Sequence, residues 1–531
     1  MKFKITSLFF TLLPNLFFAN SKNVNDIGLD KRIDQAFQPF SDFVSSIIFF
    51  EVFDGAPFVI ILLVLSALFF TLYFGFPNIK YFGKAIGVVR GKYDHIDQSS
   101  TGNSDLAIDG DIKDTIADES KDGEVTHFQA LATAVSGTVG NGNIAGVALA
   151  IALGGPGATF WMIICGLLGM STKFVECTLG VQYRDVGEDG TVYGGPMYYL
   201  SKGLKEKGFS VLGKITAVLF AIFCIGGSFG GGNAAQSNQA TIVIKDLMGL
   251  QSNSAGAFIG IVLAFLVGII IIGGIKRIAS VTEKIVPFMA VLYLLACIYI
   301  ILINLTLVDD AISLIISQAF NPKAIGVGGI IGVLLVGFKR AAFSNEAGAG
   351  SASIAHSAVK TKYSASEGLV ALLEPFIDTV VICTMTALVI IIFNFRGAFE
   401  YGGTNGIVLI DGIPYEGAGI TSMAFAEYIP YSNVFLTVAV VLFAVSTMIS
   451  WSYYGLQSWM FVFGKSKLSD YTYKILFLLF IVIGAAGDMS AVWTFSDAMI
   501  LALVFPNMIG LFFLYPKVKE ELQKYLNAIR T

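Results

Sequence analysis

Long apolar runs, each about the length of a membrane-crossing helix, recur along most of this chain. The hydrocarbon core of a bilayer takes about 20 consecutive apolar residues per helical crossing. Eleven segments fit that length, the first of them near 57–76. The other ten lie near 127–153, 156–183, 211–245, 255–275, 285–307, 324–359, 368–395, 432–463, 472–486 and 491–515. The pattern predicts an all-α polytopic membrane protein with eleven transmembrane helices.

The composition favours a membrane protein over a water-soluble one. Of 531 residues, 55% are hydrophobic and 14% are charged, whereas soluble proteins carry about 25% charged residues. The 57 glycines and 45 phenylalanines suit close helix packing and contact with lipid. A net charge of −4 argues against nucleic acid as a partner, because a phosphate-binding surface needs a basic excess. The lipid membrane is therefore the expected environment.

The start of the chain, residues 1–19, resembles a secretory signal peptide. Lys2 and Lys4 precede an apolar stretch, which is the usual order in such peptides. Phe17 would stand three residues before a cleavage after Ala19, where a small residue is preferred. The sequence thus leaves cleavage open, and in either case the polar residues that follow are predicted to lie outside the cytoplasm.

Three further segments precede the main body of the chain. Residues 20–54 are predicted to be periplasmic or interfacial, with a helix near 35–53 that lies in the membrane interface. Residues 55–78 hold the first transmembrane helix. Residues 79–126 form a predicted cytoplasmic loop, which is solvated because it is acidic and rich in Ser and Gly.

Basic residues fall mainly on one side of the predicted spans. Lys and Arg in short loops stay on the cytoplasmic side of a membrane. With the N-terminus outside, the inner loops and the tail hold most of these residues. After the first span, the outer loops hold only Lys245, Lys323 and Arg396. We predict a multi-pass protein of the bacterial inner membrane, with its N-terminus outside and its C-terminus inside.

Two of the later apolar segments are interrupted, at 136–146 and 337–351, by stretches rich in Gly and polar residues. An unpaired backbone group in hydrocarbon costs several kcal/mol, so such a stretch must be buried in protein or line a cavity. Close helix packing through Gly142 and Gly146 is the alternative interpretation. The amide and charged side chains between the glycines weigh against it, because such groups at membrane depth usually mark a pathway.

The interrupted segments are the first members of two sets of five spans, at 127–307 and 324–515. Because five is odd, the second set must enter the membrane from the opposite side. The sequence thus predicts an inverted repeat with a discontinuous first helix in each half, within a core at 127–515 and ahead of a tail at 516–531. Interrupted segments at matching positions of two halves are typical of the binding site of a secondary transporter.

Several motifs in this core resemble those of the alanine or glycine:cation symporter family. They are Gly140-Asn141-Gly142-Asn143-Ile144-Ala145-Gly146-Val147, Gly194-Gly195-Pro196-Met197-Tyr198-Tyr199, Phe343-Ser344-Asn345-Glu346-Ala347-Gly348 and Phe376-Ile377-Asp378-Thr379. The resemblance covers about 124–515, and the motifs occur in the family's order. It implies a fold similar to that of the bacterial leucine transporter, with ten core helices and one extra N-terminal helix. It also implies sodium-coupled uptake of alanine or glycine. The signal-like start, the acidic loop and a long outer loop at 396–430 depart from the family's pattern.

A zwitterionic amino acid needs hydrogen-bond donors for its carboxylate and acceptors for its ammonium group. Backbone N–H groups at the start of a half-helix bind anions, and we expect Gly140, Asn141 and Gly142 to supply them. Asn143, in the same break, is expected to take part in the site. Acceptors for the ammonium group are expected from Gln236 and Thr447, with Ser344 and Asn345 as further candidates.

The resemblance to the leucine-transporter fold also implies a sodium site. Its ligands would be the carbonyl oxygens of Ser136 and Val139 and the hydroxyl oxygens of Ser446 and Thr447, with a further carbonyl near Phe443. From the residues alone the alternative is stronger, because Ser and Thr in membrane helices often bond to their own preceding turn. Sodium is expected as the coupling ion, with no other cofactor.

Large side chains are expected to limit the size of the substrate. Thr447 and Trp451 are four residues apart and therefore share a helix face, and Phe338 or Phe343 is expected to close another wall. A pocket so filled leaves room for the hydrogen of glycine or the methyl group of alanine. The alternative for Trp451 is a place in the aromatic belt at the membrane interface.

Buried ionisable residues suggest further interpretations. Lys339, Arg340 and Glu346 are close enough in sequence to compensate one another, either as a structural network or as a gate. Asp378 could relay a proton, which would make H⁺ the coupling ion. Near the inner end of the third span, Lys173 and Glu176 lie one turn apart and are expected to form an exposed helix pair.

Three classes of function compete: a secondary symporter, an ion channel and a membrane enzyme. A channel usually repeats a filter loop around an axis through several subunits, and no such loop is evident. A Ser/His/Asp set, a metalloprotease motif and a nucleotide-binding loop are absent from the sequence, so an enzyme or ATP-driven transport is not expected. The symporter is favoured, with no oligomer implied.

Overall fold

The computed structural model describes residues 29–53, 56–96, 123–187, 190–250, 252, 254–320, 329–403, 406–487 and 489–530. These residues are mostly helical. The signal-like segment at 1–19 and the most acidic part of the predicted loop, at 97–122, lie outside the described residues.

The elements of the first half include a helix at each predicted span, and the helix over the span predicted near 285–307 begins earlier, at Gly274. They are α2 (Leu29–Ile48), β1 (Glu51–Phe53), β2 (Ala56–Pro57), α3 (Phe58–Tyr73), α4 (Pro77–Lys80), α5 (Phe82–Val89), η1 (Asp94–Ile96), α7 (His127–Thr138), η4 (Gly142–Gly146), α8 (Val147–Gly154), α9 (Gly157–Gln182), β3 (Asp185–Val186), β4 (Val192–Tyr193), α10 (Pro196–Tyr198), η5 (Tyr199–Gly203), α11 (Leu204–Glu206), α12 (Ser210–Phe229), η6 (Gly230–Ala234), α13 (Ala235–Met248), α14 (Ala255–Ile271) and α15 (Gly274–Ile303).

The second half has the same helical character. Its elements are η7 (Leu305–Leu307), α16 (Val308–Phe320), α17 (Gly329–Asn345), α18 (Ala352–His356), α19 (Ser364–Ala371), α20 (Leu373–Pro375), η8 (Phe376–Cys383), α21 (Thr384–Asn394), β5 (Val408–Ile410), β6 (Ile413–Tyr415), α22 (Ala418–Ala426), α23 (Ser432–Phe463), α24 (Lys467–Ala486), α25 (Met489–Ala502) and α26 (Val504–Ala528). The strands form three separate two-stranded antiparallel sheets.

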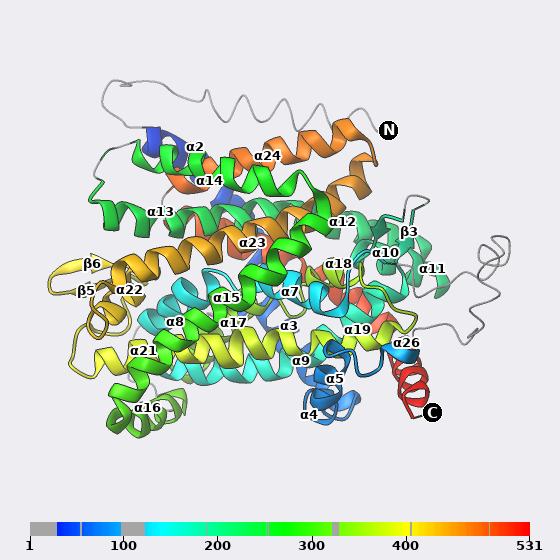
Figure 1. Cartoon of the computed structure of the whole chain (residues 1–531), viewed down its shortest axis with the longest axis horizontal. Helices are drawn as coiled ribbons and strands as arrows, with labels where there is room; N and C mark the ends of the chain where they lie inside the picture. The colour runs from blue at the N-terminus through cyan, green and yellow to red at the C-terminus, as the bar shows by residue number, and fades with distance from the viewer. Residues whose placement is uncertain are drawn as a thin grey trace.

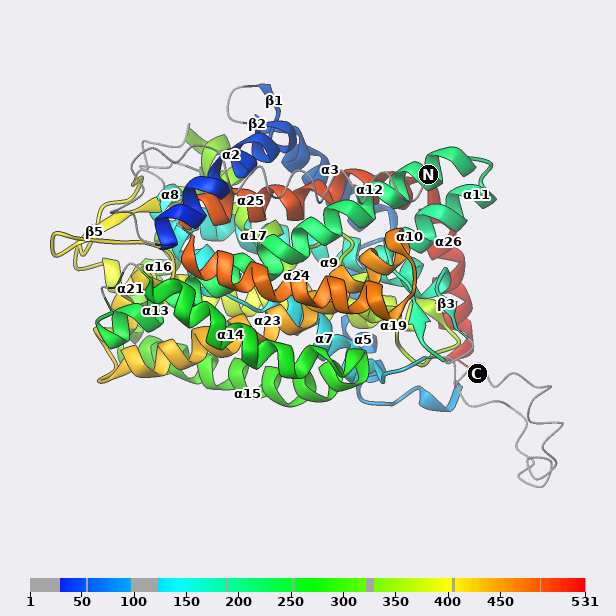
Figure 2. The same ribbon diagram turned by 90° about the horizontal axis from the view of Figure 1, so that it is seen from above.

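Most of the long helices run roughly along one axis of an elongated bundle (Figure 1). One end of the bundle carries β5, β6, α22 and α16, and the other carries α10, α11, β3 and the end of α26 (Figures 1 and 2). We call the second of these the basic end, because Lys202, Lys205 and Lys207 lie there. It is the end predicted to face the cytoplasm.

The helices are long and apolar enough for a membrane protein. Among the described residues seven helices could each cross a bilayer, or eight if α7 and α8 form one bent span. Two predicted spans coincide with the shorter apolar helices α3 and α14. Phe258 and Phe265 of α14 are 68% and 69% exposed, as expected for side chains that face lipid. The total of eleven spans and the inverted repeat stay predictions.

The first predicted interruption is confirmed. A capping box, in which Thr126 and Gln129 bond reciprocally, begins α7, and the helix ends at Thr138. Val139 leaves the helical conformation with ψ of 89°, and the chain resumes as the π-helical segment η4. The two halves of this span meet at an angle of 51°. Backbone groups near Val139 thus lose their helical partners in the middle of the bundle.

The second predicted interruption is also confirmed. Helix α17 ends at Asn345, and Glu346 adopts a left-handed conformation with φ of 55° that is rare for a residue with a side chain. Gly348 and Gly350 have φ of 93° and 86°, which glycine adopts readily, and α18 then begins. Three further π-helical segments, η5, η6 and η8, were not predicted, and η6 and η8 lie within otherwise continuous helices.

Candidate binding site at the interrupted helices

The first break lies where several elements meet. Helix α7 packs against α15, α18 and α23, while η4 contacts α17, α22 and η8. Backbone freed at the break therefore faces side chains from elements more than a hundred residues away in the sequence. A polar stretch in this position is buried in protein, which is the condition for its existence at membrane depth.

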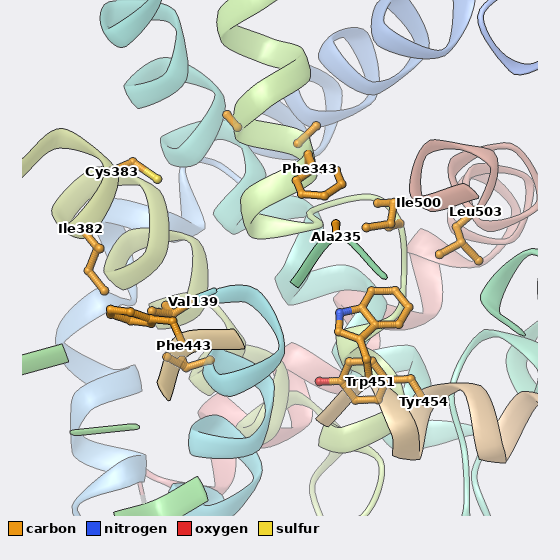
Figure 3. Close-up of a cluster of buried hydrophobic side chains, with 14 of the residues drawn as sticks. Val139, Ala235, Phe343, Ile382, Cys383, Phe443, Trp451, Tyr454, Ile500 and Leu503 are labelled. Atoms are coloured by element: carbon orange, nitrogen blue, oxygen red, sulfur yellow. The ribbon is translucent and has the colours of Figure 1, made fainter. Parts of the chain in front are cut away.

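The predicted sodium ligands lie close together. Thr447 Oγ1 donates to the carbonyl oxygen of Ser136 at 3.0 Å, and Ser136 Oγ donates to the carbonyl oxygen of Ser446 at 2.8 Å. Ser446 Oγ donates to the carbonyl oxygen of Phe443 at 2.9 Å. Val139 lies beside Phe443 in Figure 3. The result is a set of buried, neutral oxygen atoms from α7 and α23, the type of ligand that sodium takes from broken helices.

The alternative interpretation, a hydrogen bond to the preceding turn of the same helix, fits the hydroxyl group of Ser446 and not that of Thr447. Ser446 does bond to the carbonyl group of its own preceding turn, at Phe443. Thr447 instead donates across to α7. Its hydroxyl group joins the two elements, so helix stability alone does not account for Thr447.

Two of the three N–H groups predicted to hold a carboxylate donate hydrogen bonds to side-chain oxygens. Gly140 N–H donates to Asn143 Oδ1 at 2.9 Å, and Asn141 N–H donates to Gln236 Oε1 at 3.0 Å. A Cβ atom at Gly140 would collide with the Thr447 hydroxyl group, so only glycine fits there. A Cβ atom at Gly142 would lie 3.3 Å from Ser344 Cα. The break therefore presents N–H donors to amide oxygens, which are neutral counterparts of carboxylate oxygens.

Asp378 of η8 connects both breaks. Its Oδ1 accepts from Asn143 Nδ2 at 2.6 Å, and its Oδ2 accepts from Ser344 Oγ at 2.9 Å and from Thr379 Oγ1 at 2.7 Å. Among the described residues, no Lys, Arg or His side chain forms an ion pair with Asp378. A fully buried carboxylate with only neutral donors is costly and suggests a role beyond packing.

Trp451 lies inside the bundle, facing the second break. It is 1% exposed, and its indole N–H donates to Glu346 Oε1 at 2.9 Å. A Cβ atom at Gly232 of η6 would collide with the indole ring. The alternative interpretation, a residue of the interfacial belt, is therefore wrong, because belt residues expose their polar edge to the headgroups.

The two candidate phenylalanines have different neighbours. Phe343 lies in the same cluster as Trp451, Ile500 and Ala235 (Figure 3). The ring of Phe338 instead lies 6.5 Å from that of Trp161 on α9. Of the two, Phe343 is the one that shares a cluster with Trp451, and its ring lies 5.0 Å from that of Trp493.

One prediction about charged residues is wrong and a second is wrong in part. Lys339 and Arg340 pair with Asp497 of α25 rather than with Glu346, and the Lys339 contact is 3.1 Å. Lys173 lies 3.9 Å from Glu176 as predicted, but this pair is fully buried rather than exposed, and Lys173 also binds Glu374 Oε1 at 2.9 Å. In both cases the partner comes from a distant element, so sequence spacing alone could not find it.

Sequence reasoning also missed the π-helical segments that position Gln236 and Asp378. Gln236 follows the π-helical η6, and Asp378 lies in the π-helical η8. Such segments often mark functional sites in membrane and soluble proteins. The run Gly230-Gly231-Gly232 was a signal that could have indicated the first of them.

Comparisons with known proteins agree with the resemblance. The family model for the sodium:alanine symporter family matches residues 41–531. The chain is 38% identical to the sodium/alanine symporter AgcS of Methanococcus maripaludis, over 92% of this chain and 98% of that protein. It is 34% identical to the probable sodium/glutamine symporter GlnT of Bacillus subtilis, over 78% and 81%.

Among solved structures, MhsT in complex with L-phenylalanine is a distant likeness. Its TM-score is 0.47 with 15% identity, over 76% of this chain and 99% of that one. The family model spans nearly the whole chain, and the relatives match most of their own length. The chain therefore belongs to the sodium:alanine symporter family.

Proposed function

We propose that this protein is a secondary active symporter that uses a sodium gradient to take up a small neutral amino acid, alanine or glycine. The observation that carries the proposal is the group of neutral oxygens at the first break, contributed by Ser136, Ser446 and Thr447. Hydroxyl and carbonyl oxygens solvate a small hard cation without adding charge. A named relative, the sodium/alanine symporter AgcS, supports the choice of sodium and alanine.

We assign sodium to the oxygens of Ser136, Val139, Ser446 and Thr447. Thr447 Oγ1 now donates to the Ser136 carbonyl group, so this proton would turn away when the cation takes its place. The cation then offsets part of the negative charge that an amino acid carboxylate brings into the site.

The substrate carboxylate is assigned to the N–H groups of Gly140, Asn141 and Gly142. The amide oxygens of Asn143 and Gln236 now accept from two of these groups. Substrate binding would replace them with carboxylate oxygens, which form stronger charge-assisted bonds. The displaced amide oxygen of Gln236 would then be free to accept from the ammonium group.

The preference for alanine or glycine over larger amino acids rests on Trp451 and Phe343. The relative GlnT is a probable glutamine symporter, so members of the family differ in substrate size. In this chain the indole ring is held by Glu346 and fits against the bare backbone of Gly232. A ring fixed on both sides cannot move aside cheaply for a longer side chain.

Replacing Trp451 with alanine is expected to widen this pocket. Leucine and methionine should then compete with labelled alanine at least about tenfold better, because burial of such a side chain contributes about 1.5–3 kcal/mol. Competition for sodium-dependent uptake is the measurement. Trp459→Ala is the matched control, since Trp459 lies on the same helix and bonds to Ser469 outside the site. Equal competition in all three proteins would refute the assignment of Trp451 to the wall.

Proton coupling is the second candidate, and Asp378 is the observation that favours it. A buried carboxylate without a basic partner is suited to binding either a cation or a proton. In the sodium mechanism its charge attracts the cation towards Asn143 and the first break. In the proton mechanism Asp378 itself would gain and lose a proton in each cycle.

Uptake into proteoliposomes distinguishes these candidates. An inward sodium gradient at equal pH should accumulate labelled alanine above its external concentration, and a sodium ionophore should abolish the accumulation. Accumulation driven by a proton gradient without sodium would support the second candidate. Uptake that only reaches equilibrium under both gradients would indicate a channel and contradict the proposal.

A further inference from the structure

Five buried titratable side chains form a continuous chain in the half of the bundle towards the basic end. His127 Nδ1 contacts Glu367 Oε2, and His356 Nδ1 lies 2.5 Å from Glu367 Oε1. His356 Nε2 lies 3.6 Å from Glu374 Oε2, and Glu374 Oε1 lies 2.9 Å from Lys173 Nζ. Four of the five side chains are fully buried, and that of His127 is 11% exposed. His127 is thus the member that water can reach.

This row of five side chains joins both interrupted spans. His127 begins α7, the half-helix before the first break, and His356 ends α18, the half-helix after the second break. Both half-helices lie on the same side of the breaks. Glu367 of α19 contacts both histidines at once. Separating α7 or α18 from α19 would therefore break a contact between an imidazole and this carboxylate.

The charges of this row of side chains, counted with the neighbouring Glu176, balance only when protons are bound. Glu176 Oε1 lies 3.9 Å from Lys173 Nζ, which brings the carboxylates to three: Glu176, Glu367 and Glu374. With all three carboxylates ionised, Lys173 leaves a charge of −2, and protonation of His127 and His356 brings it to zero. Buried charge without compensation is costly. The arrangement in which α7 and α18 pack against α19 therefore favours two protonated imidazoles.

Other titratable side chains on the surrounding elements do not remove this need. They include Lys84 on α5, Cys177 on α9, Glu283 on α15, Glu346 before α18, Asp378 in η8 and Tyr454 on α23. The basic residues of α15, Lys276, Arg277 and Lys284, are exposed to solvent. Cys177 and Tyr454 are neutral in their protonated forms. Glu346 and Asp378 lie near Lys173 and Glu374 and supply no positive charge, and Lys84 is partly exposed to solvent. None of these neighbours is a buried cation, so the surroundings do not replace the protons.

We propose that His127 and His356, together with Glu367 and Glu374, form a proton-binding site that is separate from the proposed sodium and substrate site. Protons pass between water and the imidazole nitrogens, with His127 as the first acceptor. Bound protons hold α7 and α18 against α19. Their loss leaves uncompensated negative charge, and the helices then separate and open this end of the bundle.

Cys177 reports on this opening, because it is fully buried on α9 one turn from Lys173. The purified full-length protein, free of sodium and amino acids, is treated with N-ethylmaleimide at a series of pH values. The alkylated fraction of Cys177 is followed by mass spectrometry. Rates for His356→Gln are divided by wild-type rates at the same pH, which cancels the intrinsic pH dependence of the thiol.

The proposal predicts a ratio near one in alkaline buffer, where the wild-type imidazole is neutral. The ratio should rise as the pH falls, by up to about tenfold per pH unit for one linked proton. His95→Gln is the matched control, because His95 is exposed in η1 and should give a ratio near one throughout. Glu367→Gln removes the charge that retains the protons, so its ratio to the wild-type rate should also rise as the pH falls.

A ratio that is the same at every pH would overturn the proposal, because it would give His356 a purely structural role. Should His356→Gln fail to fold, Glu367→Gln decides the question by the same criterion. The result is independent of the proposed function, since neither sodium nor substrate is present. A protein that shows the proton response but transports no amino acid would refute symport and leave the proton-binding site in place.

Discussion

Replacing Asn143 with alanine is expected to lower sodium-dependent alanine uptake by roughly 100-fold, because two to three kcal/mol of hydrogen bonding is lost. The side chain accepts from Gly140 N–H and donates to the buried carboxylate of Asp378. Without it the break loses its shape, and Asp378 loses its shortest hydrogen bond. Initial uptake rates in proteoliposomes with matched protein content measure the effect.

Asn394 provides the control for this variant. It is also a buried asparagine with two hydrogen bonds, both to Phe399, but it lies at the end of α21 away from both breaks. Asn394→Ala is expected to reduce thermal stability while the affinity for sodium is retained. Equal uptake by Asn143→Ala and the wild-type protein would remove Asn143 from the site.

Replacing Thr447 with valine should raise the sodium concentration for half-maximal uptake about tenfold, since one ligand oxygen is worth about 1–1.5 kcal/mol. Valine keeps the shape of the side chain and removes only the hydroxyl group that meets the Ser136 carbonyl group. The half-maximal sodium concentration is measured at saturating alanine. The maximal rate at high sodium should change less, because added cation compensates for the lost ligand.

Thr437→Val tests whether this effect is specific. Thr437 lies on the same helix, and its hydroxyl group bonds to the carbonyl oxygen of Val243, remote from the first break. It should leave the sodium dependence unchanged. If both valine variants shift the sodium dependence equally, the effect comes from helix α23 as a whole and Thr447 is not a sodium ligand.

The broken helices could be predicted from the sequence because local composition determines them. Glycine at Gly140 and Gly348, interleaved with polar residues, cannot sustain a helix in hydrocarbon, and both breaks lie where that reasoning put them. The helical class followed from apolar run length in the same way. The approach of Ser136 to Thr447 was implied only by the family resemblance.

Long-range pairing could not be predicted. Arg340 finds Asp497, and Lys173 finds Glu374, across 157 and 201 residues respectively. Such partners depend on how helices are arranged in space, which periodicity does not specify. The π-helical segment that carries Asp378 was also missed, because a single extra residue in a helical turn leaves the apolar pattern almost unchanged.

The location of bound sodium tests the central claim most directly. A structure of the purified protein with sodium and alanine, compared with one in potassium without alanine, would locate the ion. We predict density for a cation between the backbone of α7 at Ser136 and Val139 and the side chain of Thr447 on α23, with the alanine carboxylate at Gly140 to Gly142. Sodium and alanine bound elsewhere, with the first break unchanged between the two conditions, would contradict the account.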